Sequence, residues 1–186
     1  MKLILAACLA LVVVPALADD AALIAETKMT ALGIPPKLLQ MVQDEIDKGS
    51  YHGAIAACSD KAPKMAAAAS QSTGWAIRRV SLKNRNPKAV PDAWEQAALE
   101  EFDRRRAAGE NAAMMEKAEI VAEGDKRVLR YIKALPTQKL CLNCHGQADQ
   151  MTAEVRSRLS EIYPADKATG YTEGQVRGAL TVKRPL

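Results

Sequence analysis

Residues 118–135 read AEIVAEGDKRVLRYIKAL, and this stretch decides the class of the fold. Residues 118–123 and 126–135 are rich in residues that favour β-strands. Gly124-Asp125 between them has the length and composition of a tight hairpin turn. A hairpin places its two strands side by side and antiparallel, so the sequence predicts an antiparallel sheet.

The rest of the chain is predicted to supply two more strands and several helices. Residues 75–83 (WAIRRVSLK) and 175–183 (QVRGALTVK) have the composition of strands. Asp92, with Glu95 three residues later, predicts the capped start of a helix. Further helices are expected at residues 20–32, 35–48 and 53–58, and from Pro63 onward. A last, short helix is expected to begin with Thr152 as its cap and to end before Pro164. Because helices and strands do not alternate as βαβ units, the chain is predicted to be an α+β protein.

Length and composition restrict the class of protein further. The chain has 186 residues, of which 48% are hydrophobic and 26% charged, and this suits one domain with its own core. The net charge is +4, and basic residues are not interleaved with aromatic ones, so nothing predicts nucleic-acid binding. Aromatic residues make up only 4%, so the core must be aliphatic or must pack around a group that the chain does not encode.

The N-terminus has the three parts of a secretory signal peptide. Met1-Lys2 is positive, residues 3–14 are apolar throughout, and residues 16–18 (ALA) form a small-x-small cleavage site. We therefore expect a signal peptide at residues 1–18 and a single mature domain at residues 19–186. The protein would be exported, to the periplasm in a Gram-negative host, with no integral membrane segment in the mature chain.

An alternative is a lipoprotein. Residues 5–8 (LAAC) resemble a lipobox, in which Cys8 would carry the lipid. Cleavage there would leave an apolar region of only about five residues, below the usual 7–15, which disfavours this alternative.

The chemistry is concentrated in residues 141–145 (CLNCH), a C-x-x-C-H motif. This is the attachment signature of c-type haem, because residues i, i+3 and i+4 share one face of a helical turn. Cys141 and Cys144 would form two thioethers to one covalently bound haem, and His145 would ligate the iron. The alternatives are a zinc site, with His52 or Cys58 as a further ligand, and a redox disulfide, which needs a βαβ setting that is absent here.

The ligand opposite His145 stays open at the level of the residues. Candidate groups are Met, His, Cys or none. The methionines and His52 are each explained as core, surface or turn residues. Once Cys8 is removed with the signal peptide, three cysteines remain, and an odd number cannot pair completely. Cys58 is then either a small buried thiol or an iron ligand.

Five stretches together resemble a family of single-haem c-type cytochromes with a PAS-like haem-binding domain, long described only as a domain of unknown function. They are residues 54–66 (AIAACSDKAPKMA), 79–95 (RVSLKNRNPKAVPDAWE), 141–146 (CLNCHG), 163–171 (YPADKATGY) and 175–179 (QVRGA). The resemblance implies helices around a PAS-like antiparallel sheet. It also implies that Cys58, followed by Ala62-Pro63, ligates the iron opposite His145.

Haem propionates need positive partners, and Arg78, Arg79, Lys83 and Arg85 cluster around one predicted strand. Side chains alternate along a strand, so Arg78 and Arg79 cannot both face the haem. Arg79 lies in a stretch that resembles the family and is our candidate. The others are expected to be solvated surface charges.

The function predicted from these residues is electron transfer by an exported monohaem cytochrome, with an unidentified redox partner. A haem-based redox or gas sensor that acts through a separate signalling partner is the alternative. Enzyme chemistry such as peroxidase activity needs an open iron site, which ligation by Cys58 would close. We therefore expect a protein that is not an enzyme.

Overall fold

The computed structural model describes residues 16–186 of the chain. Most of the predicted signal peptide, including Cys8 of the alternative lipobox, lies outside the described residues, so export stays a prediction. The first described element, helix α1 (Ala16–Leu32), begins four residues before the helix that the sequence predicts at Asp20. No helix within residues 16–186 combines the length and the apolar character that crossing a membrane requires.

The predicted antiparallel sheet is confirmed, with four strands. They are β1 (Ala76–Val80), β2 (Glu116–Glu123), β3 (Lys126–Pro136) and β4 (Val176–Pro185), in the order β1-β4-β3-β2. All three pairings are antiparallel. The predicted hairpin joins β2 to β3: Glu123 pairs with Lys126 across the turn, where Gly124 has a φ of 62°. This left-handed conformation is one that glycine adopts at little cost.

The helices confirm the predicted α+β class. After α1 come α2 (Pro35–Asp47), α3 (Tyr51–Ala56), α4 (Ala62–Thr73), α5 (Ala93–Ala107), α6 (Leu142–His145) and α7 (Ala153–Ile162). The predicted start of α5 is a capping box: the Asp92 side chain accepts from the Glu95 N–H, and the Glu95 carboxylate accepts from the Asp92 N–H. A π-helical turn, Ala57–Lys61, joins α3 to α4 where the sequence suggests only regular helix.

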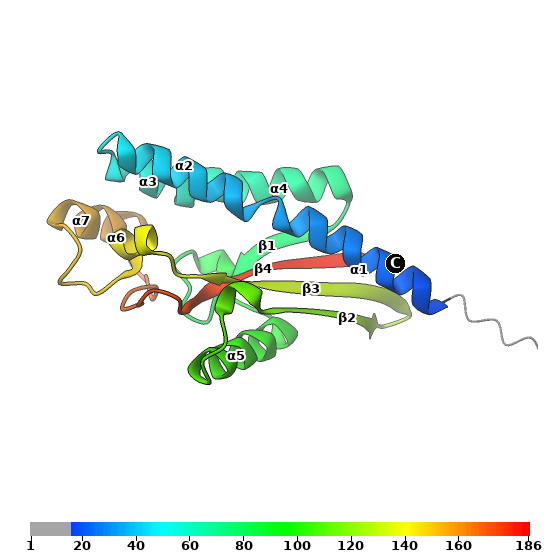
Figure 1. Cartoon of the computed structure of the whole chain (residues 1–186). Helices are drawn as coiled ribbons and strands as arrows, with labels where there is room; N and C mark the ends of the chain where they lie inside the picture. Colours follow the sequence, from blue (N-terminus) through cyan, green and yellow to red (C-terminus); the bar gives the residue numbers. More distant parts are fainter. Residues whose placement is uncertain (1–15) are drawn as a thin grey trace, which may run out of the picture.

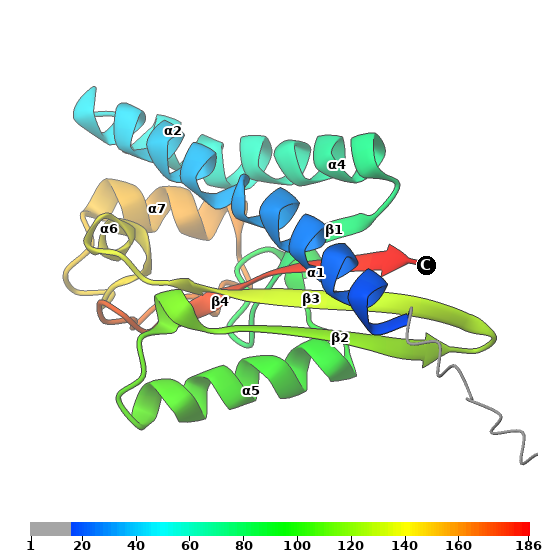
Figure 2. The same ribbon diagram turned by 45° about the vertical axis from the view of Figure 1, so that its right-hand side comes forward.

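The sheet separates two layers of helices. Helix α5 packs on one face, while α1, α2 and α4 lie over the other (Figure 1). Helices α6 and α7 lie beyond one end of the sheet, on the same side as α2 (Figure 2). The chain between β3 and β4 therefore leaves the sheet, forms α6 and α7, and returns.

The face under α5 is filled by the protein's own side chains. Its ten buried residues are Val80, Ala98, Leu99, Phe102, Ala112, Met115, Ile132, Ala134, Val176 and Ala179. The partly buried Trp94 packs against them. The opposite face has two smaller clusters, one under α1 and one between α2 and the α3–α4 segment, and these leave a cavity between them and α6.

Candidate functional site

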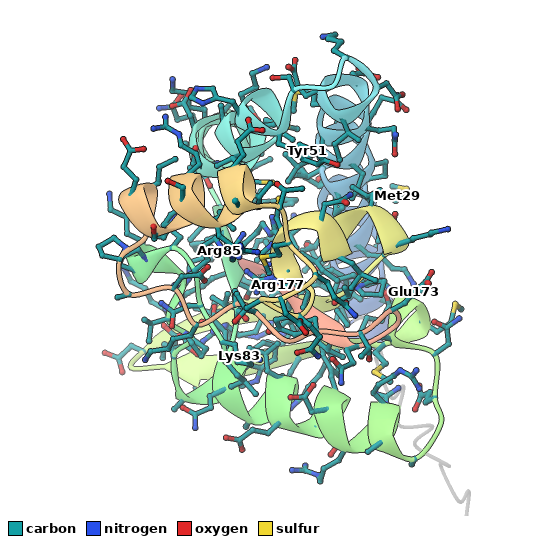
Figure 3. The ribbon with its side chains drawn as sticks, turned by 90° about the vertical axis from the view of Figure 1, so that its left-hand side faces the viewer. Met29, Tyr51, Lys83, Arg85, Glu173 and Arg177 are labelled. Carbon is teal, nitrogen blue, oxygen red and sulfur yellow. The ribbon has the colours of Figure 1, made fainter. Side chains whose placement is uncertain are left out.

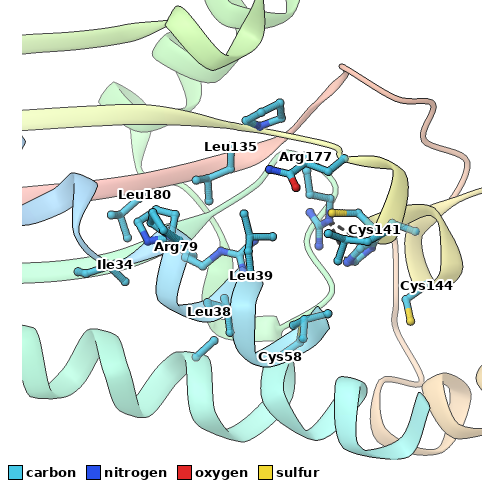
Figure 4. A pocket seen from close by; sticks show the side chains of 18 of the residues that line it. Ile34, Leu38, Leu39, Cys58, Arg79, Leu135, Cys141, Cys144, Arg177 and Leu180 are labelled. Atoms are coloured by element: carbon cyan, nitrogen blue, oxygen red, sulfur yellow. Dashed lines mark hydrogen bonds between the residues drawn. The ribbon is translucent and has the colours of Figure 1, made fainter. Parts of the chain in front are cut away.

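A cavity of about 510 Å³ lies between the sheet, α2, the α3–α4 segment and α6. This volume is within the range of sites that hold small molecules and cofactors. Most of its lining is apolar, including Ile34, Leu38, Leu39, Leu135 and Leu180, which Figure 4 shows around the space. Such a lining suits a large, flat apolar group, because burial of its surface is favourable.

The C-x-x-C-H motif forms one wall of this cavity. A short 3₁₀ turn, Lys139–Cys141, leads into α6, so that Cys141, Cys144 and His145 all line the same space. Gly146 follows at once, and a Cβ placed there would lie 2.6 Å from the Leu142 carbonyl oxygen. The glycine thus permits a close turn of the backbone after the motif.

His145 is held in one orientation by the backbone. Its Nδ1 lies 2.7 Å from the carbonyl oxygen of Ala168, a fully buried residue. A carbonyl only accepts, so Nδ1 carries the hydrogen and Nε2 keeps the lone pair, which accepts from the Arg177 Nε–H at 3.4 Å. Burial lowers the pKa of His145, and the guanidinium of Arg177 beside it lowers it further. The ring is therefore neutral at pH 7, the form in which imidazole binds a metal.

The two motif thiols are protonated in this environment. Burial raises the pKa of Cys141 and raises that of Cys144 to about 11. Neither forms a disulfide, and Cys58 is also a free thiol.

Cys58 lines the same cavity from the helical layer and lies on the π-helical turn. It is exposed, so the alternative that it is a small buried thiol is wrong. Figure 4 shows it across the space from Cys141. A π turn adds one residue to the helix and changes the direction of the side chains that follow, and such turns occur often at functional sites. The structure thus brings Cys58 to the same cavity as the two motif thiols and His145, although these residues follow Cys58 by 83 to 87 positions in the sequence.

Three arginines line the cavity as well: Arg79, Arg85 and Arg177. Arg79 is the arginine that the sequence predicts at this place. The predicted alternation of side chains along the strand is confirmed, because Arg78 points to the other face of the sheet and forms an ion pair with Glu95 of α5. The prediction that Arg85 is a solvated surface charge is wrong. Its side chain is 8% exposed and forms an ion pair with Asp166. The sequence did not single out Arg177, although it lies in one of the family-like stretches.

Arg85 and Arg177 lie close to each other between the sheet and the α6–α7 region (Figure 3). Arg177 donates to the Ser81 hydroxyl at 3.0 Å, and its Nε lies 3.2 Å from His145 Nδ1. Burial lowers the pKa of Arg177 to about 10, and repulsion from Arg79 and Arg85 contributes. One end of the cavity therefore has an excess of positive charge.

The remaining candidate ligands lie elsewhere, with one exception. His52 is exposed and lines a separate hollow against α7, so it does not meet the motif. Of the methionines, Met65 lines the cavity, while Met29 and Met114 are exposed and Met115 and Met151 belong to other parts of the core. Within residues 16–186, no three His, Cys, Asp or Glu side chains group closely enough to hold a metal ion.

The comparisons with known proteins agree with this geometry. The family model described as "Tll0287-like: Tll0287" matches residues 15–185. The solved crystal structure of the cyanobacterial heme-protein Tll0287 is similar, with 27% sequence identity and a TM-score of 0.65. The match covers 87% of this chain and 94% of that protein. No curated protein sequence matches the chain.

Proposed function

Because the chain belongs to the Tll0287-like family, we propose that it is an exported protein that binds one haem covalently and transfers electrons. One observation carries this proposal. Cys141, Cys144 and His145 line a cavity of mainly apolar character, and it is large enough for a cofactor. A bound haem would supply one-electron exchange between ferric and ferrous iron.

The motif thiols would attach the haem. Each S–H would add across one vinyl group, so that a carbon–sulfur bond forms and the hydrogen passes to the neighbouring vinyl carbon. This addition needs no oxidant, and the buried, protonated state of both thiols is compatible with it. His145 would ligate the iron through Nε2, because its Nδ1 is committed to the Ala168 carbonyl.

Cys58 would be the second protein ligand to the iron. It faces the cavity from the wall opposite the motif, and its place on a π-helical turn is an irregularity that regular helix formation does not explain. An anionic thiolate stabilises ferric iron and lowers the reduction potential. Ligation by both His145 and Cys58 would keep peroxide from the iron, so the protein would not act as an enzyme.

Arg79 and Arg177 would balance the charge of the haem propionates. Arg79 has no ion pair or hydrogen bond to another described side chain, which leaves its guanidinium available. Arg177 lies at the same end of the cavity, next to His145. A redox partner protein would then receive or supply the electron, in the periplasm if the host is Gram-negative.

Absorption spectroscopy of the exported protein tests the proposal. In cells with cytochrome c maturation, we expect a pyridine haemochrome spectrum typical of two thioethers and a mass increase equal to one haem. Cys141→Ala/Cys144→Ala should lose both signals. Cys58→Ser is the matched control: it should keep the covalent haem and change the ferric spectrum. Wild-type protein without covalent haem would contradict the proposal.

Sensing is the second candidate, and the π-helical turn favours it. A helix can absorb or release the extra residue of such a turn by a local change of register, which would withdraw Cys58 from the iron. Binding of CO or NO to the ferrous protein, with a change in structure, would support sensing. A reversible potential without gas binding would support electron transfer.

A further inference from the structure

The peptide group of Ala168 is held from both ends by charged side chains. Its N–H donates to Asp166 Oδ1 at 2.8 Å. Its carbonyl accepts from His145 Nδ1 at 2.7 Å and from Arg85 Nη2 at 3.2 Å. Ala168 has no exposed surface, so water does not compete for these bonds.

Arg85 and Asp166 also bind each other. Arg85 Nε donates to Asp166 Oδ2 at 2.9 Å, and both side chains are largely buried. Arg85 Nη2 donates in addition to the carbonyl of Cys144, the residue before His145. The pair therefore links the motif to the loop of residues 163–171, which is otherwise joined to it by backbone bonds from Gly170 and Tyr171.

We propose that Arg85 and Asp166 are positioning residues that set the strength of the His145–Ala168 hydrogen bond, and through it the reduction potential. The inference rests on the proposed function, since it needs a haem on His145. A ligating histidine that donates strongly from its second nitrogen becomes a better electron donor to the metal. Arg85 donates to the same carbonyl and thus competes with His145 for its electron density.

The two partners should act in opposite directions. Arg85→Gln removes a buried positive charge near the iron and frees the Ala168 carbonyl for His145, and both changes stabilise ferric iron. Asp166→Asn keeps an oxygen that can accept from the Ala168 N–H, but it removes the carboxylate that compensates Arg85 and Arg177. The uncompensated positive charge should favour ferrous iron.

Spectroelectrochemical titration of the haem-loaded full chain tests this inference. For Arg85→Gln we expect a more negative midpoint potential, with at least a tenfold change in the ferric-to-ferrous ratio at fixed potential, which corresponds to about 59 mV. For Asp166→Asn we expect a more positive potential. Arg85→Lys, which keeps the charge, should shift the potential less than Arg85→Gln.

A control and a separate readout make the outcomes distinct. Lys167→Gln removes a positive charge from an exposed position of the same loop and should leave the potential nearly unchanged. The pyridine haemochrome spectrum reports the proposed function independently, and each variant should retain it. If the midpoint potentials of Arg85→Gln and Asp166→Asn shift with the same sign, the substitutions have only loosened the loop, and the inference is overturned. Unchanged midpoint potentials overturn it as well. If Arg85→Gln binds no haem, the potentials of Asp166→Asn and Arg85→Lys test the inference in its place.

Discussion

The two faces of the sheet are built in different ways. Under α5, ten buried apolar residues pack against one another, and a polar layer closes one edge, where the guanidinium of Arg130 lies 4.7 Å from the Trp94 ring and bonds to Asp92. A hollow of about 450 Å³, lined in part by Asp103 and Arg106, lies at the margin of this core. On the other face, apolar side chains from α2, the strands and the α3–α4 segment surround about 510 Å³. The face under α5, the closed face, has a continuous apolar centre, whereas the centre of the other, the open face, is left open.

Aromatic side chains lie on both faces, but only the open face leaves space for a cofactor. The closed face contains Phe102, the only phenylalanine in the chain, together with Trp94. On the open face, Tyr131 and Trp75 pack under α1 and Tyr163 lines the cavity, whose other lining consists mostly of aliphatic side chains, cysteines and arginines. A haem would fill the space that these side chains leave open, so the stability of the two faces should respond differently to substitution and to the cofactor.

The largest effect is expected on the closed face. Phe102→Ala removes a side chain that is 1% exposed, and such truncations lower the free energy of unfolding by about 3–5 kcal/mol. Because Phe102 is separated from the cavity by the sheet, the loss should be equal in protein made with and without cytochrome c maturation. Urea unfolding followed by circular dichroism measures both. A loss that depended on haem would break the distinction between the faces.

A smaller and conditional effect is expected on the open face. Leu39 lines the cavity and is only half-buried. Leu39→Ala should cost about 2 kcal/mol or more in haem-loaded protein, where the cofactor would cover the side chain, and less than about 1 kcal/mol without haem. The same unfolding measurement applies. Equal costs in the two forms would mean that Leu39 does not contact the cofactor.

The start of α5 tests the polar edge of the closed face. Asp92→Ala removes the side-chain acceptor for the Glu95 N–H and a partner of Arg130, so it should lower the free energy of unfolding by about 1 kcal/mol. Asp92→Asn keeps the capping oxygen and serves as the matched control. Equal losses in both variants would show that charge, and not capping, is what Asp92 supplies.

The smallest effect concerns the charge of Asp92. Burial alone would raise its pKa, but the Glu95 N–H and the Arg130 guanidinium outweigh burial and lower the pKa below 3.8. The carboxylate therefore stabilises the folded protein above pH 3.8, and this contribution disappears as the pH falls through the folded pKa. The difference between wild type and Asp92→Asn should be below about 1 kcal/mol at pH 7 and vanish in acid. Thermal unfolding across this range measures it.

Local signals in the sequence predicted most of the fold. The hairpin of β2 and β3, the capping box at Asp92 and the cap at Thr152 each depend on residues a few positions apart, and all three are confirmed. The resemblance to a haem-binding family is confirmed by the family match over residues 15–185. The motif at residues 141–145 is equally local, since one turn of helix brings its three functional side chains to one face.

Other parts of the site depend on contacts across the chain. Arg85 lies in a loop whose composition suggests a solvated charge, but its partner Asp166 is 81 residues away, and only the folded chain buries the pair. The hydrogen-bond acceptor for His145 Nδ1 is a backbone carbonyl, and the type of a residue in the sequence does not indicate such an acceptor. The π-helical turn at Cys58 is likewise not indicated by the sequence, because its Ala-rich composition suggests regular helix.

The sequence by itself determined the class of the fold and the order of its helices and strands, because these depend on residue type and on spacing of a few residues. Only the tertiary structure decided which charges are buried, which nitrogen of His145 carries the hydrogen and which residues share a cavity. Those properties depend on what surrounds each group, and the surroundings of one residue come from segments far from it in the chain.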